Sequence, residues 1–179
     1  AGLSRGLGDV YKRQLINILN SGKITDGTEI AATKEIYAGA ADDLYTHQSK
    51  PEAVNSLISK INSGAKFVQT QYCFDIEVIK FYSNLLLNNG KNASWKVLVG
   101  MGPLKSARQA DWMRKNLWGI NISDEIIDRL DKSEDPISEG EKICIELIDQ
   151  IKDLPGIDGV HLMGPNCESQ SANIIKALT

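Results

Sequence analysis

The stretch GAKFVQTQYCFD, residues 64–75, decides how the chain is predicted to fold. Its apolar part, AKFVQT at 65–70, predicts a buried strand, and a helical pattern follows directly. The strand ends in Gln69 and Gln71, whose amides need hydrogen-bonding partners. Because side chains alternate along a strand, we expect both amides on one face and Thr70 on the other. A strand followed at once by a helix is a βα unit, and such units recur along the chain.

Three more strands are predicted at 35–41, 95–100 and 158–163, where apolar and β-branched residues gather. Apolar residues at i, i+3, i+4 and i+7, with glycine or proline near the ends, predict the helices. We expect a capping box, formed by Ser138 and Glu141, in the helix that begins near Ser138. The other predicted helices lie at 15–22, 51–64, 75–90, 106–116, 123–130 and 168–178.

Strand–helix alternation four times over predicts an α/β fold with four parallel strands joined by crossover helices. Two architectures fit this order: a doubly wound sheet, or part of a (β/α)8 barrel. Four units make half a barrel, so we favour the C-terminal half of a (β/α)8 TIM barrel for residues 15–179. Residues 1–14 fall outside the periodic pattern, and GLGDVYKRQ within them resembles a translated sequencing adaptor. We interpret them as a non-native leader.

The composition is that of an ordinary globular protein. Of 179 residues, 42% are hydrophobic and 24% charged, and the formal net charge is −3. This balance gives no electrostatic reason to expect nucleic acid or an anionic membrane as a partner, and no apolar run is long enough to span one. The three widely spaced cysteines form neither a disulfide framework nor a metal-binding pattern, which favours a reducing cytoplasm.

In both architectures, ligands bind where the strands end. The amides of Gln69 and Gln71 suit a heterocycle with mixed donors and acceptors, although such a glutamine can also simply cap loop backbone. His161 in the last strand is a candidate for acid–base work or an ordinary core histidine. Asp42 and Asp43 lack partners at metal-ligand spacing and are interpreted as a solvated loop or a helix cap.

The loop in VGMGPLKSARQ, residues 99–109, places two glycines and a proline before a helix. Such a turn can present backbone N–H groups to an anion, with Lys105 nearby, or it can be an ordinary tight turn. The residues alone therefore indicate a βα enzyme with a polar, uncharged ligand site.

Several segments in the same order resemble the methylenetetrahydrofolate reductase family. GAKFVQTQYCFD is similar to that family's GA-x-F-apolar-x-TQ-x-x-FD segment, and KVLVGMGPLKSARQADWM resembles the segment that follows it. GINISDEIIDRL, GEKICIELIDQI and LPGIDGVHLM continue the likeness, and EIYAGAADD precedes it. The similarity runs from about residue 15 to the C-terminus, which is more specific than any single motif.

This resemblance implies an FAD-binding (β/α)8 barrel of one-carbon metabolism. The implied reaction reduces 5,10-methylenetetrahydrofolate to 5-methyltetrahydrofolate with electrons from NAD(P)H. The catalytic glutamate and the aspartate that tunes the flavin are expected in an N-terminal half absent from this sequence, so the fragment alone is expected to be inactive. Homo-oligomerisation is left open. The implied folate-binding residues are Gln71, Gln109 and Met113, and the implied flavin-side residues are Lys60, Ala41 and Met163.

The chain departs from the family pattern at several of these positions. Ala41 and the loop to Tyr45 replace a flavin-contacting tyrosine and histidine, Met113 replaces an aromatic residue, and Met163 and Cys167 replace a tyrosine and an arginine. These departures motivate a second hypothesis, a non-catalytic folate-binding or regulatory relative. A third hypothesis is an unrelated phosphate-binding barrel enzyme that uses the loops at Gly102 and Gly164.

Overall fold

The computed structural model describes residues 11–12, 14–31 and 34–179. Its centre is one parallel sheet of four strands in the order β1-β2-β3-β4. The predicted α/β architecture with four parallel strands is confirmed. Most of the predicted leader lies outside the described residues, and the boundary after residue 14 stays a prediction. The strands are β1 (Gly39–Asp42), β2 (Phe67–Tyr72), β3 (Lys96–Met101) and β4 (Gly159–Leu162).

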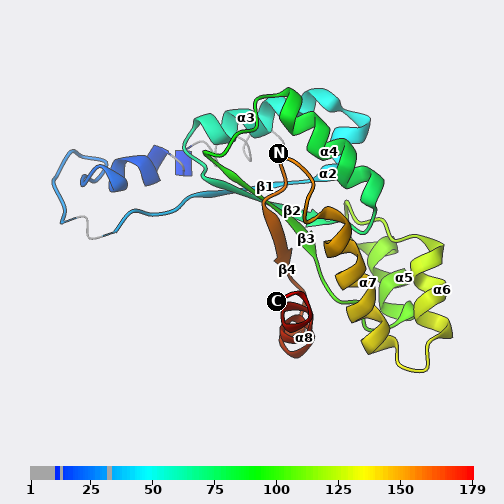
Figure 1. Cartoon of the computed structure of the whole chain (residues 1–179). Helices are drawn as coiled ribbons and strands as arrows, with labels where there is room; N and C mark the ends of the chain where they lie inside the picture. Colours follow the sequence, from blue (N-terminus) through cyan, green and yellow to red (C-terminus); the bar gives the residue numbers. More distant parts are fainter. Residues whose placement is uncertain (1–10, 13, 32–33) are drawn as a thin grey trace.

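Each strand is followed by helical structure, as the alternating pattern predicted. Residues 14–20 are also helical and lie in the arm that extends from the sheet (Figure 1). The helices are α2 (Leu44–Ser49), α3 (Val54–Asn62), α4 (Ile76–Asn88), α5 (Ala107–Asn116), α6 (Asp124–Lys132), α7 (Pro136–Ile151) and α8 (Glu168–Leu178), with a 3-10 turn η1 (Pro51–Ala53) before α3.

The core lies between one face of the sheet and the helices. Alternate strand residues point into it: Val68 in β2 and Val97, Val99 and Met101 in β3 are 0% exposed. They pack with the apolar stripes of α3, α4 and α7, which include Leu57, Ile79, Leu86, Ile148 and Ile151. This pattern of every second residue is what a sheet covered on one face requires.

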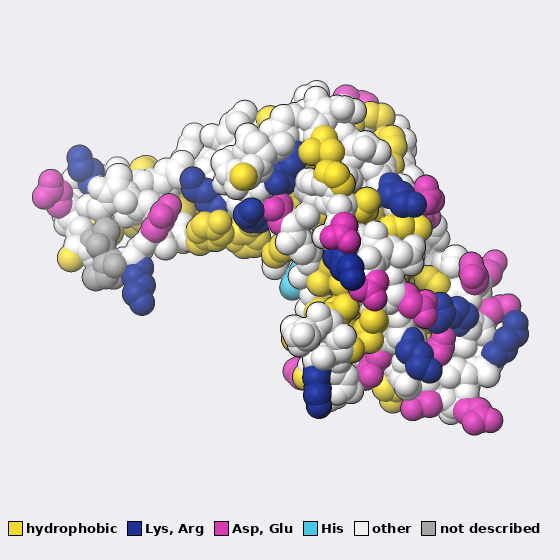
Figure 2. All heavy atoms as spheres, in the orientation of Figure 1, with side chains coloured by type: hydrophobic (Ala, Val, Ile, Leu, Met, Phe, Trp, Pro, Cys, Tyr) yellow, Lys and Arg dark blue, Asp and Glu magenta, His cyan; other side chains and the backbone are white. Residues whose placement is uncertain are grey.

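The opposite face of the sheet carries no comparable layer among the described residues. Phe67, Gln69, Leu98 and His161 on this face are only partly buried. Figure 2 shows hydrophobic side chains along the inner bend of the molecule and charged side chains gathered over α5–α7. One-sided helix cover is consistent with part of a (β/α)8 barrel, whose strands turn their second face inward.

Strand β1 is shorter than the predicted 35–41. It begins at Gly39, which pairs with Phe67, the first residue of β2. The amide of Asn20 explains the late start, because it bonds both backbone groups of Ile36: Ile36 N–H donates to Oδ1 at 2.8 Å, and Nδ2 donates to the Ile36 carbonyl at 3.0 Å. A side chain thus takes the place of a partner strand.

Helix α7 also begins earlier than predicted. The expected capping box of Ser138 and Glu141 is wrong, because Asp135 is the N-cap and accepts from the Ser138 backbone N–H at 3.2 Å. Pro136 occupies the first helical position, where its missing N–H costs nothing. Asp135-Pro136 is therefore a stronger helix start signal than the Ser138–Glu141 spacing.

Candidate functional site

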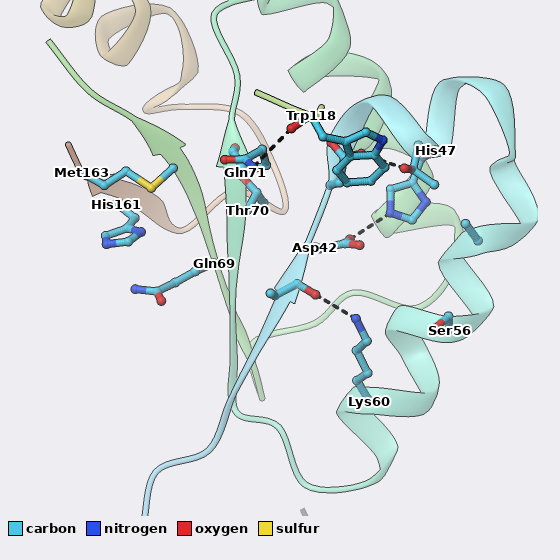
Figure 3. A pocket seen from close by; sticks show the side chains of 14 residues that line it. Asp42, His47, Ser56, Lys60, Gln69, Thr70, Gln71, Trp118, His161 and Met163 are labelled. Carbon is cyan, nitrogen blue, oxygen red and sulfur yellow. Dashed lines mark hydrogen bonds and ion pairs between the residues drawn. The ribbon is translucent and has the colours of Figure 1, made fainter. Parts of the chain in front are cut away.

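A cavity of about 590 Å³ lies at the carboxyl ends of the strands. Strand β2 contributes Gln69 and Gln71 to its wall, and the neighbouring helices contribute His47 and Lys60. Figure 3 shows these side chains around a common space. A smaller cavity of about 210 Å³ adjoins it, and Met163 lines both. Ligand-sized hollows therefore occur at the end of the sheet where parallel α/β folds place their sites.

All six residues implied by the family resemblance line these cavities. Gln71, Lys60, Ala41 and Met163 line the larger one, and Met163 also joins Gln109 and Met113 around the smaller one. The structure thus brings together residues that are up to 122 positions apart, from Ala41 to Met163. Their assignment to folate or flavin stays a prediction.

The two glutamines of β2 line the same cavity but differ in their contacts. Gln71 Oε1 accepts from the Tyr72 backbone N–H at 3.0 Å, and its Nε2 donates to the Trp118 carbonyl at 3.4 Å. Gln69 makes no side-chain hydrogen bond to another described residue, and Figure 3 shows it on the same side of the strands as His161. Loop capping, the ordinary role weighed for a strand-end glutamine, is therefore performed by Gln71.

Thr70 points to the helix-covered face, as alternation predicted. It is 4% exposed, and its hydroxyl accepts from the Gly100 N–H at 2.9 Å. The same hydroxyl lies 2.9 Å from the Gln71 carbonyl oxygen, to which it donates. The bond from Gly100 joins β2 to β3 at an irregularity, where the register between the strands shifts between Gln69 and Tyr72.

A buried hydrogen-bonded cluster joins β1 to two helices at the edge of the larger cavity. One carboxylate oxygen of Asp42 lies 2.9 Å from His47 Nε2 and accepts from the Tyr82 hydroxyl at 2.7 Å. His47 is 1% exposed and Tyr82 0%, and burial raises the pKa of Tyr82 well above its ordinary value, so it remains a donor. Sequence reasoning missed this cluster, because Tyr82 is 40 positions from Asp42 and looks like any core aromatic residue.

Asp43 has the ordinary role of a helix cap, one of the two roles expected. It is the N-cap of α2 and accepts from the Tyr45 backbone N–H at 3.3 Å and from the Thr46 hydroxyl at 2.7 Å. Both carboxylates at this end of β1 are therefore engaged within the protein. Among the described residues, no group of three or more His, Cys, Asp and Glu side chains is arranged to hold a metal ion.

Lys60 brings a cationic group to the α3 side of the larger cavity. Its ammonium donates to the Ala41 carbonyl at 2.8 Å, across the end of β1. Ser56, one turn earlier on α3, also lines the cavity. An ammonium and a hydroxyl on one helical face suit a phosphate group.

The loop between β3 and α5 is held by hydrogen bonds to its own polar groups and to the loop after β4. Ser106 caps α5 by accepting from the Gln109 N–H at 3.1 Å, and Gln109 Oε1 accepts from the Lys105 N–H at 2.7 Å. The Lys105 ammonium donates to the carbonyls of Pro165 and Asn166, at 3.1 and 2.8 Å. The Lys105 and Gln109 N–H groups and the Lys105 ammonium are thus bonded within the protein, and Lys105 links the loops after β3 and β4.

His161 fits neither of its two predicted roles fully. It is partly exposed at the cavity, and its Nδ1 is buried without a hydrogen-bond partner among the described residues. It is therefore not a satisfied core histidine.

Trp118 is a cavity residue that sequence reasoning missed. It lies in the loop after α5, and it is 75% exposed although large aromatic side chains are usually buried. Nothing in the sequence distinguishes this tryptophan from a core residue.

The described cysteines are not poised as nucleophiles. Cys73, Cys144 and Cys167 are free and buried. Burial raises the pKa of Cys73 to about 11 and that of Cys144 to about 12, so both remain protonated thiols at neutral pH. In the part of the chain that the structure describes, no helix has the length and apolar character needed to cross a membrane.

Comparison with known proteins gives one family and a structural likeness. The methylenetetrahydrofolate reductase family model matches residues 8–179. No curated protein matches the chain. One similar solved structure is an uncharacterized protein from Clostridium thermocellum, described as binding two copies of 5-methyl-5,6,7,8-tetrahydrofolic acid. Its TM-score is 0.59 at 17% identity, and the match covers 80% of this chain and 54% of that one. The chain thus spans about half the length of that protein and shares its fold.

Proposed function

Since the chain belongs to the methylenetetrahydrofolate reductase family, we propose that it binds methylenetetrahydrofolate and serves its reduction to 5-methyltetrahydrofolate with NAD(P)H. The observation that carries this proposal is the coincidence of a family match over residues 8–179 with a cavity lined by the family's expected positions. The solved neighbour's description as a folate binder supports the ligand class.

The side chains at the two cavities suit a reduced folate. Amide groups from Gln69 and Gln71 offer donors and acceptors to a heterocycle, while Met163 and Met113 provide apolar surface. Trp112, which is 55% exposed, lies beside Met113 in the smaller cavity and supplies an aromatic surface near the position where the family pattern has an aromatic residue. We propose that the larger cavity holds the pterin and the smaller one the benzoyl part of the ligand.

We further propose that FAD binds on the α3 side of the larger cavity. Lys60 and Ser56 would hold its phosphate-bearing side chain there, and Ala41 leaves room beside β1. When bound, the flavin supplies the hydride chemistry, and the protein orients the reactants. Flavin retained on the purified protein is expected to fall in Lys60→Met. Lys66→Met is the matched control, because Lys66 is exposed just before β2, at the opposite end of that strand.

The reaction is tested by following NAD(P)H oxidation in the presence of methylenetetrahydrofolate, together with the visible absorption spectrum of the purified protein. Folate-dependent oxidation with a flavin band supports the reductase. Folate binding without turnover or flavin instead supports the second hypothesis, a non-catalytic folate-binding or regulatory relative. Absence of folate binding contradicts both. The specific observation behind the second hypothesis is that Met163 and Cys167 stand where the family pattern has a tyrosine and an arginine.

The free cysteines are the basis for a proposed cellular location. Three free cysteines suit a reducing compartment, so we propose the cytoplasm. Isolation of the protein with Cys73 disulfide-bonded would contradict this.

A further inference from the structure

The last βα unit of the chain, residues 158–178, is held to the rest of the molecule by little apolar burial. Its strand, β4, lies at an edge of the sheet, and its four residues are all only partly buried. Figure 1 shows α8 beyond the end of this strand. Cys167 and Ile174 are the buried apolar residues of this range, which the structure describes in full. The neighbouring strand β3, by contrast, buries Val97 and Val99 completely.

Asp158 closes the start of the pairing between β4 and β3 with both its backbone and its side chain. Its N–H donates to the Val97 carbonyl at 2.9 Å, and its carboxylate accepts from the Val97 N–H at 2.9 Å. A side-chain oxygen thus takes the place of a strand carbonyl in the ladder. Asp158 therefore fixes the point at which β4 begins to pair with β3.

Two lysines hold the same carboxylate. The Lys96 ammonium lies 3.0 Å from Oδ1, and the Lys91 ammonium lies 3.0 Å from Oδ2. The Lys91 side chain is 4% exposed, lies over the Trp95 ring at 5.0 Å from its centre, and donates to the Asn92 carbonyl at 2.8 Å. An ammonium group so enclosed depends on its anionic partner, because water cannot replace that partner. Asp158, Lys91 and Lys96 are called the Asp158 latch below.

The Asp158 latch is charged at neutral pH. Partial burial acts to raise the pKa of Asp158, but the bonds from Lys91, the Val97 N–H and Lys96 outweigh it, so the pKa lies below its ordinary value. A depressed carboxyl pKa stabilises the folded state above the unfolded pKa, and this contribution is lost as the pH falls through the folded pKa. The latch is therefore closed at neutral pH and released only in acid.

The other end of β4 carries part of the cavity walls. Met163 follows β4 directly and lines both cavities, and Cys167 lines the smaller one. Detachment of residues 158–178 from β3 would therefore remove one wall from each cavity. The latch, at the amino end of β4, lies at the opposite end of the strand from the walls that it holds in place.

We propose that the Asp158 latch controls the opening of residues 158–178 as a unit, which detaches from β3 and α7 while the rest of the sheet stays folded. Segments with little apolar burial open at a lower free energy than the core of the same protein. Gln170 in α8 lowers the stability of the unit further, because its Nε2 is buried without a hydrogen-bond partner among the described residues. This inference goes beyond the proposed function, since it does not depend on which ligand the cavities hold.

Two cysteines report the opening at neutral pH. Cys167 is buried within the unit, whereas Cys73 is 0% exposed in the core directly after β2. The test measures the rate at which iodoacetamide labels each thiol in the purified protein, by mass spectrometry of the peptides, relative to its rate in the unfolded chain. We expect Cys167 to be labelled at least about tenfold faster than Cys73, and its rate to rise less steeply with urea, because a local opening exposes less surface.

Asp158→Asn tests the charge of the latch. The asparagine keeps an acceptor for the Val97 N–H but loses the ion pairs with both lysines. We expect the labelling rate of Cys167 to rise about tenfold, the usual effect of a lost bond to a charged group. The rate at Cys73 should change by less than about twofold, because the core stays folded.

Lys91→Met tests the same latch from its other side, with Lys80→Met as the matched control. Lys91→Met should raise the labelling rate of Cys167 by a similar factor, because Asp158 loses its enclosed partner. Lys80 pairs with Glu77 on the exposed surface of α4, at 2.8 Å, so its removal should change the rate by less than about twofold.

Two results would overturn the proposal. Equal relative rates and equal urea dependence at Cys167 and Cys73 in wild type would show that the unit opens only when the whole chain unfolds. Equal acceleration of both thiols in Asp158→Asn and Lys91→Met would show that the cluster stabilises the whole fold rather than this unit. The wild-type comparison decides the first point even if a variant fails to fold.

Discussion

The two faces of the sheet are built from alternate residues of the same strands, yet they differ in almost every property. On the helix-covered face, Val68, Val99 and Met101 are 0% exposed, and the buried Thr70 hydroxyl is fully bonded. On the cavity face, Gln69 and His161 are partly exposed and lack bonds to other described residues. The first face contributes most of the stability, and the second retains unsatisfied groups that a ligand can use.

The largest expected effect comes from a matched pair of truncations on β3. Met101→Ala leaves a cavity in the closed core, and we expect a loss of about 2–5 kcal/mol in the free energy of unfolding. Leu98→Ala, on the partly exposed cavity face, should lose less than half as much. Urea denaturation of both variants checks this. Equal losses would show that the cavity face is as tightly packed as the core.

The Asp42 cluster tests the edge where the two faces meet. Asp42→Asn weakens the bonds from His47 and Tyr82, and we expect a loss of about 1.5–3 kcal/mol, the usual value for bonds to a buried charge. Tyr82→Phe removes only one of these bonds and should cost less. In a double-mutant cycle the two losses should not add. Full additivity would mean that the tyrosine contact is energetically independent.

A smaller effect is expected at Thr70. Thr70→Val keeps the shape but leaves the Gly100 N–H without its acceptor, at a cost of about 1–3 kcal/mol. Thr70→Ser, which keeps the hydroxyl, is the control and should lie close to wild type. If Thr70→Val unfolds at the same urea concentration as Thr70→Ser, the hydroxyl bridge does not hold the irregular pairing of β2 and β3.

The smallest expected loss in the free energy of unfolding concerns an ion pair on the outer surface of the helix layer. Arg129 donates to both oxygens of Glu146, at 2.7 and 3.0 Å, and these bonds hold the pKa of Glu146 below its usual range. A depressed carboxyl pKa stabilises the fold above the unfolded value of about 4.3 and ceases to do so as the pH falls through the folded value. Glu146→Gln should therefore lose less than about 1 kcal/mol at neutral pH.

The difference between Glu146→Gln and wild type should disappear in acid. Urea midpoints measured at neutral pH and well below the ordinary glutamate pKa check this. A difference that persists in acid would mean that the side chain acts through packing rather than charge.

The sequence predicted the architecture well because local patterns carry it. Alternation in AKFVQT gave the strand and placed Thr70 on the face opposite to Gln69. The periodic apolar stripes gave α3 to α8, but the short helix α2 was not predicted. Prediction from the sequence failed where a side chain distant in the sequence determines where an element ends or which groups are hydrogen-bonded. The Asn20 amide shortens β1, and the Tyr82 hydroxyl completes the Asp42 cluster, and neither leaves a local signature.

The candidate site was only partly predictable for a related reason. The family resemblance named Gln71, Lys60 and Met163, and all three line the larger cavity. It could not show which glutamine of β2 is occupied, because that depends on the backbone of Tyr72 and Trp118. Hydrogen-bond occupancy is a property of the folded chain.

The short length of β1 has a consequence for how this chain meets other chains. Strand β1 lies at an edge of the sheet, and exposed strand edges are templates for strand addition and aggregation. This strand is only four residues long, and the Lys60 ammonium already bonds the Ala41 carbonyl in it. A short edge strand with a lysine on it offers little backbone for another chain to pair with.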